Sequence, residues 1–546
     1  MRLCPVADLV CINADIVTMD QTRPKAEAVA VAGDRILGVG SDEEMLALAA
    51  DKAEIVDLGG RLVLPGFMDS HMHFYDFALG LKNLGLADVT DFSQLIARVS
   101  RAVLSAESGS WILGQGWNEA DWPQQKYPTR LELDKAAPDN PVILWRCDLH
   151  LAAVNSAALA AAGITAQTPD PPEGAIDRDA SGEPTGILRE RAANLVKDAV
   201  VQPSDAEMEQ AMTEAASALH SYGLTGVHDV RLMDEIEGGA RMLRAWQRLR
   251  DRGELNLRVW CGLPGESIDE ACTLGLRTGL GDEFLRLGHL KYFADGGMGA
   301  RTAWLVEPYL DAACGMPLVR PEALEPLLIQ ADRAGIGVMV HAIGDRAVRE
   351  VIGAFENMFE VRHNDPDGRT ERPSVPHRIE HVQMIRPEDL KRLARLDVVA
   401  CVQPHNMILD IGMIDACVAE NGRFTYPFRD LMASGVPTMF SSDCPVCDPR
   451  PLTGIHAAVN RCRTNGSPSG GWYPDQKVEV MEAVAAYTRT PAMAYGMDAH
   501  LGSITPGKLA DFIALDRNIF EINLSLIANT AVDMTVFGGE IVHRLI

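Results

Sequence analysis

The sequence predicts an α/β protein with three parts: a (β/α)8 TIM barrel, a small β-sandwich domain built from both termini, and an insertion after barrel strand 1. The middle of the chain carries short apolar runs separated by helical patterns, which indicate βαβ units and a parallel sheet. Both ends alternate apolar and polar residues around Gly and Asp, which is typical of hairpins. The first gap between apolar runs is about 150 residues, against about 30 for one barrel unit.

The β-sandwich domain is predicted at residues 1–64 and 497–546. ADLVCINADIVTM and AVAVAGDRILGVG alternate with a period of two near the N-terminus, and ADFIALD and TVFGGEIVHRL are strand-like near the C-terminus. Two separate β caps would give the same pattern. We expect one domain that draws on both ends.

The barrel is predicted over residues 65–496. Most spacings between its later strands are about 20 to 50 residues, which suits barrel units. The expected strands are, in order, 63–70, 224–230, 257–262, 287–294, 336–341, 376–381, 397–404 and 435–442.

The insertion is predicted at about residues 80–200. It follows the C-terminal end of the first strand, and (β/α)8 barrels carry their active sites on that rim. We therefore expect it to cover the mouth and restrict substrate size. Its aromatic residues favour an apolar pocket; they include Trp111, Trp117, Trp122 and Trp145.

The composition is that of a globular protein, with 47% hydrophobic and 23% charged residues. The net charge of −26 argues against general binding to nucleic acid or to an anionic membrane. No apolar stretch approaches the length of a transmembrane helix, and the N-terminus has no secretory pattern. With sparse cysteines as well, we expect a cytoplasmic protein. A homodimer is expected only because symmetric dimers are common.

Polar side chains fall at or near the C-terminal ends of several predicted strands. The spacing of His71 and His73 places both on one face of a strand. Imidazole and carboxylate are natural ligands of zinc and similar ions. Each histidine alone would fit a buried core residue, but together the residues predict a metal site. The set is His71, His73, Lys291, His341, His381 and Asp443.

Two interpretations fit Lys291. Burial lowers the pKa of a lysine by disfavouring its charged form, and the neutral amine can then react with carbon dioxide to give a carbamate that bridges two metals. Alternatively, a plain lysine pairs with Asp443 or orients the substrate. Composition does not decide between them.

The order His-x-His, Lys, His, His, Asp resembles the metal-dependent amidohydrolase superfamily, and the details resemble its amidohydrolase 3 branch, which includes N-substituted formamide deformylase. The resemblance covers nearly the whole chain. The segments that carry it are LPGFMDSHMHF, GLTGVHDV, LKYFADGGMGARTAWL, VHAIGDRAV, RIEHVQMI, VQPHN, SSDCPVCDPRPLTGIHAAVNR and GSITPGKLADFIALD.

The resemblance implies a role for each residue of the set. His71 and His73 would bind a first metal ion, to which Asp443 also binds. Lys291, if carboxylated, would bridge to a second ion bound by His341 and His381. The expected cofactor is therefore one or two divalent ions, with Zn2+ as the first choice.

The expected mechanism is hydrolysis by a metal-activated water. A bound divalent ion lowers the pKa of water toward about 7. Asp443 would act as general base and pass the proton to the leaving nitrogen, while a metal or a neighbouring histidine polarises the carbonyl; Asp443 and His381 are the predicted catalytic residues. The expected substrate is a small-molecule amide. Deamination and cyclic-amide opening use the same ligands, and a regulatory member without activity could keep the fold.

The sequence also offers substrate-binding candidates, namely Trp117, His150, His228 and Arg301. Trp117 would form an apolar wall, and His150 would donate to a carbonyl oxygen. The alternatives are core packing for Trp117, a buried structural histidine at 228, and an ordinary ion pair for Arg301.

One feature departs from the family pattern. Cys444 and Cys447 form a C-x-x-C directly after Asp443. Packing thiols, a redox pair and an additional soft metal ligand are all compatible with it. No redox chemistry or nucleotide cofactor is expected, because the sequence has neither a P-loop motif nor a Rossmann glycine motif.

Overall fold

The computed structural model describes residues 6–546 apart from 120–121, 148–150, 173, 231–235 and 365–371. Two compact units can be separated in it, one of residues 1–75 and 212–546 and one of residues 76–211. Among the described helices, none combines the length and the apolar character that a membrane crossing requires.

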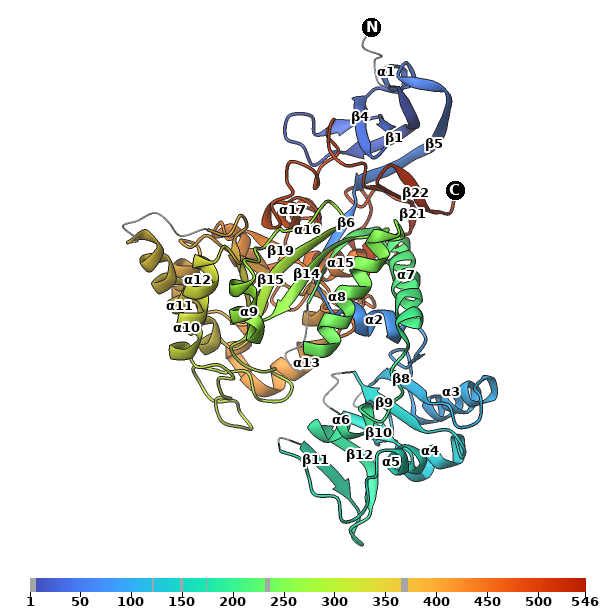
Figure 1. Cartoon of the computed structure of the whole chain (residues 1–546), viewed down its shortest axis with the longest axis vertical. Coiled ribbons are helices and arrows are strands. Elements are labelled where there is room, and N and C mark those ends of the chain that lie inside the picture. The colour runs from blue at the N-terminus through green and yellow to red at the C-terminus, as the bar shows by residue number, and fades with distance from the viewer. Residues whose placement is uncertain (1–5, 120–121, 148–150, 173, 231–235, 365–371) are drawn as a thin grey trace. The chain divides into compact units, whose positions relative to one another are not determined.

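The first unit contains an eight-stranded sheet in which every neighbouring pair is parallel (Figure 1). The strands follow one another in the sheet as they do in the chain. This confirms the predicted barrel. In order they are β6 (Phe67–Met72), β13 (Leu224–Asp229), β14 (Arg258–Pro264), β15 (Leu285–Phe293), β16 (Val338–Ala342), β17 (His377–His381), β18 (Val398–Val402) and β19 (Thr438–Phe440).

The start of the first barrel strand differs from the prediction. Residues 63–65 belong to β5 (Ala49–Pro65) of the terminal sheet, where Val63 pairs with Ala514. The ladder of β5 ends at Pro65, because proline has no N–H to donate to it. The barrel strand then begins at Phe67.

The first and last barrel strands are joined by a buried carboxylate. Asp69 on β6 accepts hydrogen bonds from the backbone N–H and the hydroxyl of Ser442, the latter at 2.5 Å. Beyond the strand ends, the N–H of Asp443 donates to the carbonyl of His71, and that of His73 to the carbonyl of Cys444, both at 2.8 Å. The ends of β6 and β19 therefore lie side by side.

Helices alternate with the barrel strands, and the longest is amphipathic. α11 (Asp345–His363) buries Val348, Val351, Ile352 and Phe355, which recur at helical spacing. The other helices after β13 are α8 (Ile236–Asp251), α9 (Ile268–Thr273), α10 (Pro321–Arg333), α12 (Pro387–Leu393), α13 (Pro404–Val418), α14 (Phe428–Ala433), α15 (Pro451–Asn460), α16 (Val480–Tyr487) and α17 (Arg489–Ala494).

Both ends of the chain form one sheet, as predicted. β5 pairs in parallel with β1 (Ala7–Val17) and antiparallel with β20 (Phe512–Leu515). Apolar residues from both ends share one core, which includes Cys11, Val31, Val63, Phe512 and Val536. The remaining elements are β2 (Lys25–Ala26), β3 (Ala28–Ala32), β4 (Arg35–Gly40), α1 (Asp42–Leu46), β21 (Val532–Phe537) and β22 (Glu540–Arg544).

The second unit follows the first barrel strand and has its own six-stranded sheet. Its core includes Trp117, Trp122 and Leu144. Its elements, with the helices that flank it, are α2 (Phe74–Gly80), β7 (Leu84–Gly85), α3 (Phe92–Ser105), β8 (Ile112–Trp117), α4 (Arg130–Ala136), β9 (Val142–Arg146), β10 (Leu151–Val154), α5 (Ser156–Ala161), β11 (Gly174–Arg178), β12 (Pro184–Glu190), α6 (Arg191–Lys197) and α7 (Asp205–Ser221).

Candidate metal and active site

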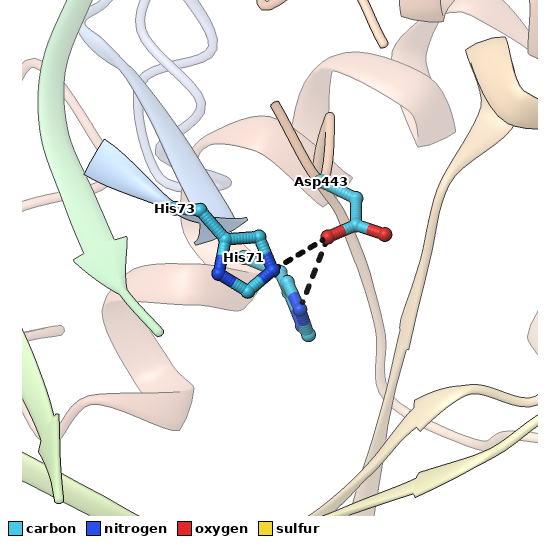
Figure 2. Close-up of side chains that lie close together, drawn as sticks. All are labelled: His71, His73 and Asp443. Carbon is cyan, nitrogen blue, oxygen red and sulfur yellow. Dashed lines mark ion pairs between the residues drawn. The ribbon is translucent and has the colours of Figure 1, made fainter. Parts of the chain in front are cut away.

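Two imidazoles and a carboxylate converge where β6 and β19 end (Figure 2). The Nε2 atoms of His71 and His73 lie 3.4 and 3.2 Å from the same oxygen, Oδ1 of Asp443. One ligand atom from each residue lies within 4.8 Å of the other two. The backbone of Asp443 has a φ of +58°, a left-handed conformation that is uncommon in residues other than glycine.

The protonation states of His71 and Asp443 suit the binding of a cation. Burial opposes ionisation of Asp443, but its contacts with the neighbouring histidines outweigh it, so the pKa of this carboxyl is below its usual value. Burial, followed by the charge of Lys291, lowers the pKa of His71 to about 3. At neutral pH the carboxylate is therefore charged and the His71 imidazole is neutral.

Two further histidines continue the cluster. The ring of His381 lies 5.2 Å from that of His71 and 4.4 Å from that of His341, between centroids. Nδ1 of His381 lies 2.8 Å from the amide oxygen of Gln403, an atom that only accepts. His381 therefore carries a proton on Nδ1, and its Nε2 lone pair stays available when the ring is neutral.

Lys291 on β15 is almost completely buried, with an exposed fraction of 2%. Its Nζ lies 4.7 Å from the centroid of the Phe293 ring. Burial lowers its pKa to about 8, although the charges of Glu380 and Asp443 act in the opposite direction. The neutral amine is therefore far more populated than in an exposed lysine.

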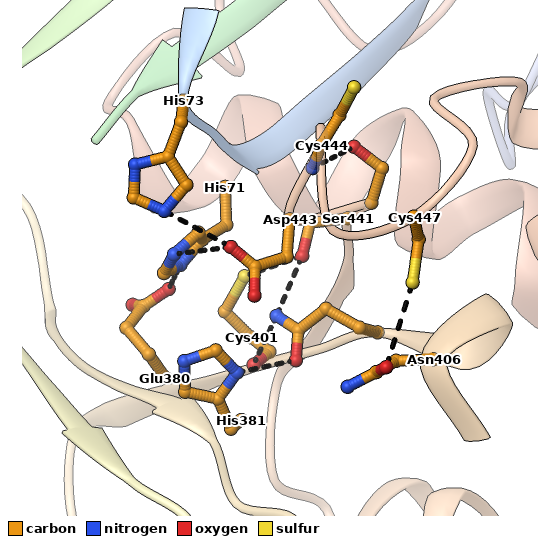
Figure 3. A network of polar contacts seen from close by, with 12 residues as sticks. His71, His73, Glu380, His381, Cys401, Asn406, Ser441, Asp443, Cys444 and Cys447 are labelled. Carbon is orange, nitrogen blue, oxygen red and sulfur yellow. Dashed lines mark hydrogen bonds and ion pairs between the residues drawn. The ribbon is translucent and has the colours of Figure 1, made fainter. Parts of the chain in front are cut away.

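Two neighbours of the cluster were missed by the sequence prediction, namely Glu380, which Figure 3 shows beside His71, and Arg378. Both are fully buried on β17. Glu380 Oε2 lies 2.5 Å from Nδ1 of His71, and both carboxylate oxygens accept from Arg378, at 2.8 and 2.9 Å. A usable signal existed: Arg378 and Glu380 are two charges at i and i+2 in a short strand, and such charges are rarely buried unless paired.

Asp295 was also missed. Its fully buried carboxylate accepts the backbone N–H groups of Trp304, Ile343 and Gly344 at 2.8 to 2.9 Å. One of its oxygens lies 3.7 Å from Nε2 of His341. It therefore ties the segment after β15 to the end of β16.

The described substrate-binding candidates have structural partners. His228 is fully buried, with Nδ1 2.5 Å from Nη1 of Arg378. Arg301 forms a bidentate ion pair with Asp311 at 2.9 Å. Trp117 is fully buried in the second unit and donates to the carbonyl of Leu144 at 2.9 Å. The substrate contacts expected of these residues stay predictions.

The candidate His150 lies outside the described residues. Cys444 and Cys447 are both buried as thiols. The thiol of Cys447 lies 3.7 Å from the amide oxygen of Asn406.

Comparisons with known proteins agree with this fold. Protein LONG AFTER FAR-RED 3 of Arabidopsis thaliana is 33% identical over 98% of this chain and 91% of its own length. N-substituted formamide deformylase of Arthrobacter pascens is 30% identical over 94% of each chain. The crystal structure of a metal-dependent hydrolase from Pyrococcus horikoshii OT3 matches 94% of this chain and 99% of its own at 27% identity, with a TM-score of 0.75.

The sequence model of the amidohydrolase family matches residues 54–543, which is most of the chain. That range includes the barrel strands and all the residues of the histidine and carboxylate cluster. The chain therefore belongs to the amidohydrolase family.

Proposed function

We propose that the chain is a metal-dependent hydrolase that cleaves the carbon–nitrogen bond of a small-molecule amide, an N-substituted formamide being the first candidate. Membership of the amidohydrolase family supports hydrolase activity in general. The observation that carries the proposal is the convergence of His71, His73 and Asp443, with the His71 imidazole neutral and the Asp443 carboxylate charged. The formamide is suggested by the relative from Arthrobacter pascens.

The donor set fits a divalent metal ion. Two imidazoles and one carboxylate are the chemistry of open catalytic zinc sites, and Glu380 contacts the second nitrogen of His71, as outer carboxylates do around zinc-bound histidines. We propose Zn2+ at His71, His73 and Asp443. A second ion would be bound by His341 and His381, with Lys291 as the bridge if it is carboxylated. A bound ion supplies a water of lowered pKa and polarises the substrate carbonyl.

The residues of the chain supply the proton chemistry. Asp443 is ionised and can accept a proton from water, then return it to the leaving nitrogen. His381 is oriented by Gln403, whose NH2 group donates to Ser441 at 2.9 Å. His381 therefore presents Nε2 in a defined direction, towards a metal or towards the carbonyl oxygen.

The test is amide hydrolysis by the purified protein with and without a chelator. N-substituted formamides, acetamides, cyclic amides and aminopurines form the panel, and amine, acid and ammonia are measured separately. We expect chelator-sensitive release of amine and acid. Ammonia release would instead favour deamination, and activity that survives complete metal removal would contradict the proposal.

Asp443→Asn should lose about 10³-fold or more in kcat, because the amide side chain cannot accept the proton. Its thermal midpoint should stay close to that of the wild type. An active Asp443→Asn protein would exclude Asp443 as the general base.

A further inference from the structure

Every N–H group of the buried Arg378 guanidinium has a partner. Nε and Nη2 donate to Glu380, and Nη2 also donates to the carbonyl of Ser70 at 2.7 Å. Nη1 donates to the hydroxyl of Tyr495 at 3.4 Å and lies 2.5 Å from Nδ1 of His228. An arginine has five donors and no acceptor. Nδ1 of His228 must therefore be the accepting nitrogen.

This contact fixes the proton of His228 on the other nitrogen. A neutral imidazole has one N–H and one acceptor. Burial, followed by the charge of Arg378, lowers the pKa of His228 well below its usual value, so the ring is neutral. Its Nε2–H is a buried donor without a hydrogen-bond partner among the described residues.

His289 on β15 has the complementary arrangement. Its Nε2 lies 3.1 Å from the carbonyl oxygen of Pro376, which only accepts, so Nε2 carries the proton. In a neutral ring with its proton on Nε2, Nδ1 is the acceptor. This Nδ1 is buried, and it too lacks a partner among the described residues.

The unused donor and the unused acceptor belong to neighbouring rings. The ring centroids of His228 and His289 are 5.4 Å apart, close to the separation of two imidazoles that share a hydrogen bond. Buried polar groups are nearly always paired, with protein or with an ordered water. A direct bond after a small shift, or one bridging water, would satisfy both nitrogens at once.

The backbone around the two rings leaves space for imidazoles. A Cβ at Gly288 would lie 2.6 Å from Nε2 of His228, and a Cβ at Gly337 would lie 2.7 Å from Cδ2 of His289. Neither glycine has the positive φ that would explain its presence by backbone conformation. Each is required by the ring that it faces.

We propose that His228 and His289 are positioning residues in a polar row, Pro376–His289–His228–Arg378–Glu380–His71, that determines which nitrogen of His71 faces the metal. Pro376 fixes the proton of His289, Arg378 fixes that of His228, and Glu380, which is bound by Arg378, fixes that of His71. Glu380 accepts a hydrogen bond from Nδ1 of His71. The unprotonated Nε2, which lies beside Asp443, is then the nitrogen that can bind a metal ion. The part of the proposal that concerns a metal rests on the proposed function, but the proton positions do not.

The proton positions can be measured on the metal-free protein. Two-bond 1H–15N spectra of protein labelled with 15N-histidine distinguish the two tautomers and the imidazolium, with assignments from single histidine substitutions. We expect neutral Nε2–H rings at His228 and His289 and an Nδ1–H ring at His71 at pH 7.5. An Nδ1–H tautomer or an imidazolium at His228 would overturn the row.

The effect on metal binding is measured by Zn2+ titration against a chromophoric chelator. His228→Leu removes the acceptor beside Arg378, and we expect a dissociation constant 10- to 100-fold higher, as for other losses in outer coordination shells. His220→Leu is the matched control, because His220 is equally buried, on α7, and its Nε2 also lacks a partner among the described residues. It should bind Zn2+ within about threefold of the wild type.

Equal Zn2+ affinities for His228→Leu and the wild type, or equal losses in both variants, would contradict the positioning role. If His228→Leu does not fold, Gly288→Ala displaces the same ring by its added Cβ and should weaken Zn2+ binding in the same direction. If the wild type binds no Zn2+, the proposed function fails. The measured tautomers of His228, His289 and His71 would still test the proposed row of hydrogen bonds.

Discussion

At the scale of single residues, the state of Lys291 would decide whether the proposed site binds one metal ion or two. Its pKa of about 8 leaves on the order of a tenth of the amine neutral at pH 7. We predict that it forms a carbamate. Wild-type protein prepared with 13C-bicarbonate should show a carbamate carbon signal that Lys291→Met lacks, and metal content should fall from two ions per chain to one. One ion per wild-type chain and no such signal would favour the plain lysine.

Glu380 should affect both metal binding and stability. Glu380→Gln retains an acceptor for His71, but leaves the buried Arg378 without its carboxylate. We predict a 10- to 100-fold weaker affinity for Zn2+ and a loss of about 3 kcal/mol in unfolding free energy. Competition titration and thermal melting measure the two effects.

Glu356→Gln is the control, because its ion pair with Arg392 is partly exposed, at 39% and 32%. Such pairs contribute about 1 kcal/mol or less. If both substitutions lowered the thermal midpoint equally, the buried ion pair of Glu380 with Arg378 would contribute no more to stability than the exposed one.

The sequence predicted which side chains meet at the ends of the barrel strands better than it predicted the contacts that support them. His71, His341, His381 and Asp443 could be found because each follows an apolar run, and the ends of parallel strands meet on one rim. The partner of His71 is Glu380, 309 positions away. Nothing in the local sequence specifies such a pair, because β6 and β17 are brought together only by the folded barrel.

For Arg301 and His228 the sequence left two interpretations open, a substrate contact or a structural partner. The structure shows a partner for each, Asp311 and Arg378 respectively, and a contact with substrate stays a prediction. The direction of a side chain depends on neighbours that only the tertiary structure brings close, so it could not be predicted from the sequence.

At the scale of elements, the barrel strands were predictable because strands buried on both faces are short, nearly continuous apolar runs. β18 is such a strand, with all five residues buried. The boundary between β5 and β6 was missed because the apolar run continues across Pro65 while the pairing partners change.

The junction between β14 and the terminal sheet depends on a buried ion pair. Arg258 on β14 makes a bidentate contact with Asp511, at 2.5 and 2.8 Å, and each side chain is 2% exposed. Asp511→Ala would leave Arg258 buried without a counter-charge, and we predict a loss of about 3 to 5 kcal/mol in unfolding free energy. Thermal melting measures it.

The exposed ion pair of Arg544 with Glu54 provides the comparison, at 41% and 55% exposure. Glu54→Ala should change the stability by less than about 1 kcal/mol. A loss for Asp511→Ala no larger than this would mean that the junction does not depend on the buried pair.

At the scale of the whole molecule, the insertion could be predicted from the spacing of the barrel strands. The insertion was visible because one gap is too long for a barrel unit, and residues 76–211 form a compact unit of their own. That the insertion covers the mouth of the barrel stays a prediction.

The net charge of −26 is a count over the whole chain with neutral histidines. Many of the histidines are buried, and burial lowers their pKa.

Those histidines predict that the metal-free protein loses stability in mild acid. A histidine whose folded pKa lies below its unfolded value of about 6.5 binds fewer protons in the folded state, so stability is lost as the pH falls through that value. Nine described histidines have a lowered pKa: His71, His220, His228, His289, His341, His377, His381, His405 and His456.

Three carboxyl groups act in the opposite direction, because burial raises the pKa of Asp69 and Asp295 to about 7 and that of Asp410 to about 6. The fold protonates these groups earlier than the unfolded chain does, which favours the fold in acid. Nine groups against three leave a net proton uptake on unfolding, and each proton of difference is worth about 1.4 kcal/mol per pH unit. The thermal midpoint of chelated protein should therefore fall from pH 7.5 to pH 5.5. A midpoint that rises over this range would mean that the buried imidazoles are charged in the fold.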